Sequence, residues 1–178
     1  LYIVRDPRNV ITSLKNHYDL NDEIAIKWLN NDKQFVYDVA NFKKHGFSDF
    51  QFISSWNINY KSWKTQTKIP IKFIKYEDLL DQTYSVFFEI LIFINKTTNN
   101  LEKIDKNKIK KVLETTSFEA LKQNEKEKGF FEAAISQKNE HKKISFFHLG
   151  PKNDWRTILK EDLKIKIEKT FENDLKEL

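Results

Sequence analysis

The chain opens with LYIVRDPRNVITSL, residues 1–14, and this stretch decides the predicted fold. Its apolar start, residues 1–4, is typical of a short buried strand. Asp6 can then accept the first free N–H groups of a helix, and Pro7 suits the first helical position. The stretch therefore predicts a strand, a tight turn and a helix. Such a unit is characteristic of α/β proteins.

The same stretch brings an arginine and a serine toward one point. Arg5 follows the strand directly, at a turn whose backbone N–H groups can also attract an anion. Ser13 lies eight residues later, where its hydroxyl can face that anion. The helix is expected to bury Val10, Leu14 and Tyr18. The alternative for Arg5 is an ordinary surface ion pair.

Composition excludes several classes of protein. The 178 residues are long enough for one domain with its own core, and the net charge is +5. The chain has no cysteine, which excludes disulfides, thiolate metal sites and a cysteine nucleophile and is compatible with the predicted cytoplasmic location. No apolar run approaches the roughly 18 residues that span a bilayer. No basic aromatic repeat or Gly/Arg-rich arm points to nucleic acid.

Residues 2–14, YIVRDPRNVITSL, resemble the 3′-phosphate-binding motif of sulfotransferases that use 3′-phosphoadenosine-5′-phosphosulfate (PAPS). The arginine and serine of that motif match Arg5 and Ser13 with their spacing kept. The resemblance implies that these two residues hold the 3′-phosphate of the cofactor. It also implies the fold, a P-loop-like α/β layer. Here it would be a helix-rich fragment with few parallel strands, a single domain over residues 1–178 that is incomplete at its N-terminus.

Residues 71–80, IKFIKYEDLL, predict a second strand that runs into a helix. They resemble the family's strand and Tyr-Glu-Asp-Leu segment, which implies that Tyr76 approaches the adenosine. Glu77 and Asp78 are adjacent carboxylates at a helix start, where the helix dipole favours them. We therefore interpret them as helix-start residues in preference to an acid–base pair.

Residues 115–121, TTSFEAL, predict a capped helix start from local chemistry. They also resemble the family's Thr/Ser-Ser-Phe segment, in which the adenine is enclosed. The resemblance implies that Thr116, Ser117 and the ring of Phe118 enclose it here. An aromatic ring stacked on a base is physically reasonable.

Residues 146–156, FFHLGPKNDWR, resemble the family's last cofactor loop. Gly150 and the Asp-Trp-basic end are kept, whereas His148 replaces arginine, Leu149 replaces lysine and Asn153 replaces glycine. The resemblance assigns His148 and Gly150 to the cofactor, and Lys152 could compensate for the lost charge. We expect weaker or pH-sensitive 3′-phosphate binding, because a histidine carries charge only when protonated. A nucleotide affinity that stays constant between about pH 6 and 8 would refute a role of His148.

Apolar periodicity predicts the other helices: residues 22–44 with a possible turn near 30–31, residues 52–63, 86–94, 104–113 and 158–175. Asn95 is expected to end the third of these in a left-handed cap. The polar stretch 124–143 is expected to be an exposed loop, which in the family closes over the active site.

The resemblance implies an enzyme that moves a sulfuryl group from PAPS to a hydroxyl or amine of a small-molecule or carbohydrate acceptor, with no metal. The family's phosphosulfate loop and catalytic histidine precede the motif that opens this chain, and none of the four histidines matches that base: His17, His45, His141 and His148. The chain also lacks methionine and starts inside a strand, so we expect further residues upstream. We expect the isolated chain to be inactive, and measurable sulfate transfer would refute this.

Two other functions stay open from the sequence. One is a non-catalytic nucleotide-binding remnant or a P-loop-like small-molecule kinase, which would show no preference for a 3′-phosphate. The other is a helical interaction module whose motifs arose by chance. Loss of nucleotide binding on Arg5→Ala would argue against the interaction module.

Overall fold

A computed structural model describes residues 1–37, 39–136, 139 and 142–178. Strands β1 (Tyr2–Val4) and β4 (Phe73–Lys75) pair in parallel, with Ile3 opposite Ile74. Parallel pairing requires a long connection, and helices supply most of it here. Both predicted strands are therefore confirmed, within a helix-rich α/β arrangement with few strands.

Helix α1 (Pro7–His17) begins as its sequence predicts. The Asp6 carboxylate accepts a hydrogen bond of 2.8 Å from the backbone N–H of Arg8, and proline occupies the first turn. The predicted buried face is confirmed only in part, because Val10 and Leu14 are partly buried whereas Ile11, which was not predicted, is fully buried. The side chains of Val10 and Leu14 pack against the core on one side and border cavities on the other.

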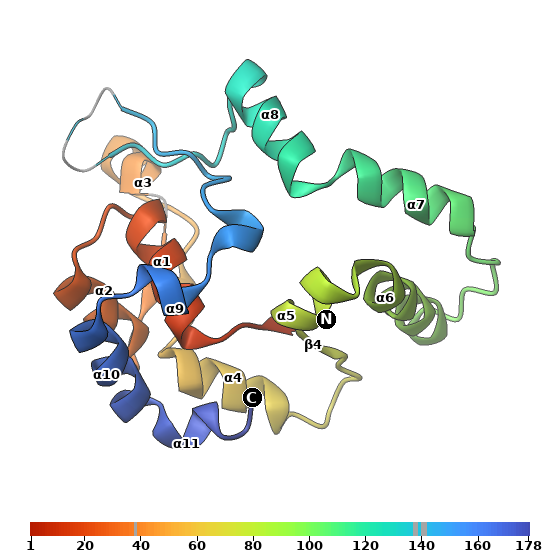
Figure 1. Ribbon diagram of the computed structural model, residues 1–178, viewed down its shortest axis with the longest axis horizontal. Helices are drawn as coiled ribbons and strands as arrows, with labels where there is room; N and C mark the ends of the chain where they lie inside the picture. Colours follow the sequence, from red (N-terminus) through yellow and green to blue (C-terminus); the bar gives the residue numbers. More distant parts are fainter. Residues whose placement is uncertain (38, 137–138, 140–141) are drawn as a thin grey trace.

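The main core lies between α1, α2 (Asp22–Leu29) and α10 (Glu161–Thr170), which lie close together in Figure 1. It consists of six buried apolar side chains: Ile11, Ala25, Leu29, Leu163, Ile167 and Phe171. Because these residues come from both ends of the sequence, the last helices hold the first motif in place.

The helical run predicted over residues 22–44 is broken at Asn30, where a turn was expected, and helix resumes only at Val39, so the prediction is wrong for the residues between. Strands β2 (Phe35–Val36) and β3 (Gln51–Phe52) then form an antiparallel ribbon around α3 (Val39–His45). The rings of Phe35 and Phe52 lie 5.2 Å apart across this ribbon. Such cross-strand aromatic pairs stabilise two short strands. Residue 38 lies outside the described residues.

Four helices follow: α4 (Trp56–Lys64), α5 (Tyr76–Asp81), α6 (Thr83–Thr97) and α7 (Lys106–Thr115). After them, α8 (Phe118–Lys128) leads the chain back over the body, so that α6 to α8 form an arch in Figure 1. The helices predicted over 86–94 and 104–113 are confirmed. Asn95 does not end α6, because the helix continues to Thr97 and the left-handed residue is Asn99, with φ of 52°.

The prediction of a loop over 124–143 is wrong for its first residues, because α8 continues to Lys128. The helix is capped by Gly129, which has a left-handed φ of 75°. Residues 137–138 and 140–141, including His141, lie outside the described part of the chain.

The helix predicted over 158–175 is divided, since α9 (Trp155–Ile158) ends at Ile158 and two helices, α10 and α11 (Glu172–Leu175), follow it. A short 3-10 turn, η1 (Gly150–Lys152), precedes α9. The chain is extended at Leu159 and Lys160, with ψ of 137° and 144°, and the acidic first turn of α10 then restarts the helix. Within the described ranges, no helix has the length and apolar character needed to cross a membrane.

Candidate functional site

A cleft of about 490 Å³ lies between α1, the start of α5, the start of α8 and the segment 146–153. Six of the predicted site residues line it: Arg5, Ser13, Tyr76, Phe118, His148 and Gly150. They come from four segments that are far apart in the sequence. Thr116 and Ser117 are not among the described residues that line the cleft.

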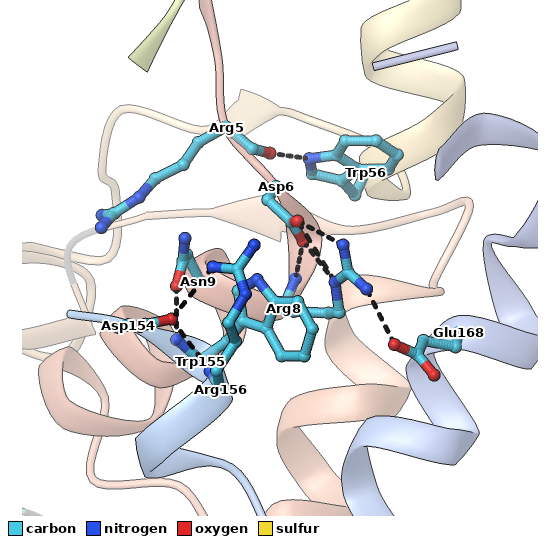
Figure 2. A network of polar contacts seen from close by, with 9 residues as sticks. All are labelled: Arg5, Asp6, Arg8, Asn9, Trp56, Asp154, Trp155, Arg156 and Glu168. Atoms are coloured by element: carbon cyan, nitrogen blue, oxygen red, sulfur yellow. Dashed lines mark hydrogen bonds and ion pairs between the residues drawn. The ribbon is translucent and has the colours of Figure 1, made fainter. Parts of the chain in front are cut away.

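Arg5 presents a positive charge that the described residues leave unpaired. Its carbonyl accepts a 3.2 Å hydrogen bond from Trp56 Nε1, while its side chain extends the other way (Figure 2). The guanidinium lies over the Tyr76 ring, with Cζ 4.1 Å from the ring centroid, and the buried Nε has no hydrogen-bond partner among the described residues. Burial lowers the pKa of Arg5, yet a guanidinium stays charged at neutral pH. A buried donor of this kind is suited to an anion.

Arg8, three residues after Arg5, has both of its charged contacts within the protein. It donates to Asp6 and to Glu168 at 2.7 Å each, and its guanidinium stacks on Trp155 with Cζ 3.8 Å from the ring (Figure 2). The hydrogen bond to Asp6 is the largest cause of a raised pKa at Arg8. Arg8 therefore fastens α1 to α10, and Arg5 is the arginine available to a ligand.

Ser13 faces the same cleft from the second turn of α1. Its hydroxyl oxygen accepts a 3.1 Å hydrogen bond from Nδ2 of Asn153. Asn153 also lines the cleft, although the sequence had indicated only the loss of a family glycine at this position.

The apolar wall of the cleft is built on the start of α8. Ser117 caps this helix, since its hydroxyl accepts a 3.3 Å hydrogen bond from the N–H of Ala120, and the predicted cap is confirmed. The Thr116 hydroxyl donates to the carbonyl of Val112 at 2.7 Å. Phe118 thus starts the helix with its ring against Gly150, whose φ is 55°.

Glu125 fixes the neighbouring aromatic loop, and sequence reasoning missed it. Its carboxylate accepts hydrogen bonds from the N–H groups of Phe146 (2.6 Å) and Phe147 (3.0 Å) and from the Ser145 hydroxyl (2.9 Å). Burial raises the pKa of Glu125, but these hydrogen bonds outweigh it and the net shift is downward. Both phenylalanines line the cleft. No pattern on α8 indicates this contact, because the partners lie about 20 residues away in an irregular segment.

Two histidines line the cleft. His148 lines it, and the His148 carbonyl accepts a 2.8 Å hydrogen bond from Lys122 Nζ. His17 lines it as well, and burial lowers the pKa of His17. Lys152 is exposed and is not one of the described lining residues. Among those residues Arg5 is therefore the permanent cation.

A larger hollow of about 770 Å³ runs along α2 and includes Lys27. None of the predicted site residues lines it, and its described lining includes no buried polar atom that lacks a partner. The smaller cleft is therefore the better candidate for an anion.

Gly150→Ala is expected to weaken nucleotide binding about 10-fold. A methyl group at this position would lie 2.4 Å from the Phe118 ring, so the ring or the loop must move, and the left-handed backbone would also be strained. Calorimetric titration with adenosine 3′,5′-bisphosphate measures the loss. Gly129→Ala is the matched control, because Gly129 has a φ of 75° but open space around it. Equal losses in both variants would contradict a role of the Phe118–Gly150 contact.

Comparison with known proteins shows the family of the chain. The model of the sulfotransferase domain family matches residues 1–178. The chain is also 25% identical over 171 residues to luciferin sulfotransferase from Photinus pyralis, an alignment that covers 94% of this chain and 42% of that protein. The chain thus spans less than half the length of this relative. With its whole length matched by the domain, the chain belongs to the sulfotransferase domain family.

Proposed function

We propose that the cleft binds the adenosine and 3′-phosphate end of PAPS. The observation that carries the proposal is the unpaired, buried Nε of Arg5, which belongs to the same cleft as Ser13 and Phe118. A guanidinium and a hydroxyl suit a phosphate, and an aromatic wall suits a base. The combination fits a phosphorylated nucleoside better than a free anion or an apolar molecule.

Each group has a defined part in this proposal. Arg5 donates to the 3′-phosphate and is held in place by its stacking on Tyr76, with Cζ 4.1 Å from the ring centroid. Ser13 donates its hydroxyl proton to the same phosphate. Phe118, with Phe147 packed against it at 6.2 Å between ring centroids, provides the face for the adenine. His148 adds charge when it is protonated.

We propose that the whole protein is a PAPS-dependent sulfotransferase. In that reaction the S–O bond to the 5′-phosphate of the donor breaks, sulfur bonds to an acceptor hydroxyl or amine that loses its proton, and adenosine 3′,5′-bisphosphate leaves. The residues of this chain contribute by orienting the nucleotide, since a fixed geometry lowers the entropic part of the barrier. A P-loop-like sheet containing β1 and β4, a small-molecule or carbohydrate acceptor and a cytoplasmic location are parts of the same proposal.

The test compares three nucleotides by isothermal titration calorimetry. Adenosine 3′,5′-bisphosphate is expected to bind at least 10-fold more tightly than adenosine 5′-monophosphate, because one charge-assisted phosphate contact contributes about 1.5–3 kcal/mol. Adenosine 2′,5′-bisphosphate is the matched control, since it carries the same charge at the wrong position. Equal affinity for the two bisphosphates would contradict the proposal, and equal affinity for all three would favour a kinase-like nucleotide site.

A further inference from the structure

We propose that Asn153 is a positioning residue of the 3′-phosphate site, because its amide directs the Ser13 proton into the cleft. The inference rests on the proposed function and adds a residue to it. Asn153 stands where the family motif has glycine, so its side chain is a feature of this chain. It is buried, with 6% of its surface exposed.

The orientation of the Asn153 amide is fixed by its neighbours. Nδ2 lies 3.1 Å from the carbonyl oxygen of Asn9, which can only accept, so the nitrogen must face this oxygen. Oδ1 accepts from the hydroxyl of Thr12 at 2.5 Å. The second N–H of Nδ2 therefore points at Ser13 Oγ, 3.1 Å away.

The same arrangement removes the usual partner of a helical serine. A serine within a helix commonly donates to the carbonyl four residues earlier, which for Ser13 is the carbonyl of Asn9. That carbonyl already accepts from Nδ2 of Asn153 and, as a carbonyl inside α1, from the backbone N–H of Ser13. No described residue accepts the Ser13 proton, and the Ser13 side chain is exposed in the cleft. The hydroxyl is thus left to donate to a ligand.

Asn153 itself is held by the loop that carries Gly150. Its backbone N–H donates to the Gly150 carbonyl at 3.1 Å, and the N–H of Trp155 donates to Asn9 Oδ1 at 2.9 Å. The loop and α1 are therefore fastened to each other through asparagine side chains in both directions. Ser13 lies at the edge of this junction that faces the cleft.

A double-mutant cycle tests the inference. The quantity measured is the 3′-phosphate preference, defined as the dissociation constant of adenosine 5′-monophosphate divided by that of adenosine 3′,5′-bisphosphate. Ser13→Ala is expected to lower it about 10-fold and Asn153→Ala about 5-fold, because one directed hydrogen bond is lost in each case. If Asn153 acts through Ser13, adding Asn153→Ala to Ser13→Ala changes the preference less than twofold.

Other outcomes are distinguishable. If Asn153→Ala lowers the melting temperature and both affinities but leaves the preference unchanged, Asn153 is merely structural and the inference fails. If the two losses of 3′-phosphate preference multiply in the double variant, Asn153 does not act through Ser13, and the inference also fails. If the unmodified protein shows no preference, the proposed function fails first, and this inference fails with it. Asn153→Gly, the residue of the family motif, repeats the test should the alanine variant not fold, and Asn124→Ala on exposed α8 is the control.

Discussion

Replacing Arg5 with methionine is expected to weaken the binding of adenosine 3′,5′-bisphosphate about 100-fold, equivalent to about 2.7 kcal/mol. Methionine keeps most of the length of the side chain but removes every donor and the charge. Nε of Arg5 is buried without a hydrogen-bond partner, so the substitution removes no hydrogen bond of this atom and loses only the stacking on Tyr76. The variant should therefore fold nearly as well as the unmodified protein. Affinity for adenosine 5′-monophosphate, which lacks the 3′-phosphate, should change less than threefold.

Arg156→Met is the matched control for this prediction. Arg156 lies at the surface beside Asp154, with 69% of its side chain exposed, and does not line the cleft. The two variants carry the same net charge, so any long-range attraction of the nucleotide falls equally in both. If Arg156→Met lost as much affinity as Arg5→Met, the effect would be general electrostatics, and the assignment of Arg5 would be wrong.

Phe171→Ala is expected to destabilise the protein by about 3–5 kcal/mol, because a large cavity would open in a fully buried site. The Phe171 ring packs edge-on against Trp56 at 5.4 Å between centroids and belongs to the core that joins α10 to α1. For a chain of this size the melting temperature should fall by roughly 6–20 °C. Thermal unfolding followed by circular dichroism measures the change.

Phe131→Ala controls for the general effect of removing a phenyl ring, since Phe131 is 87% exposed. Its melting temperature should stay within about 2 °C of that of the unmodified protein. If Phe171→Ala lowered the melting temperature only slightly, the last helices would not stabilise the first motif. The core between α1, α2 and α10 would then be wrongly placed.

The sequence indicated six residues that the structure brings together, whereas several elements of the fold were predicted wrongly. One cleft is lined by six of the predicted residues: Arg5, Ser13, Tyr76, Phe118, His148 and Gly150. Each was indicated by a short motif with a fixed place on a strand end or a helix start, and such local units are determined by neighbouring residues. The roles assigned to these residues in nucleotide binding stay predictions.

The parts that failed depend on contacts between distant residues. Strands β2 and β3 have two residues each, too few for an alternating pattern, and they pair through Phe35 and Phe52, which are far apart in the sequence. The amide of Asn153 contacts Asn9 and Ser13, more than a hundred residues away. In the sequence, Asn153 is visible only as a residue that differs from the glycine of the family motif. No local rule of helix or strand formation contains this information.

The central claim, that a 3′-phosphate lies between Arg5 and Ser13, is tested most directly by a crystal structure with adenosine 3′,5′-bisphosphate. We predict the 3′-phosphate within hydrogen-bond distance of the Arg5 guanidinium and the Ser13 hydroxyl, with the adenine against Phe118. A nucleotide bound in reverse, or in the hollow along α2, would contradict the account.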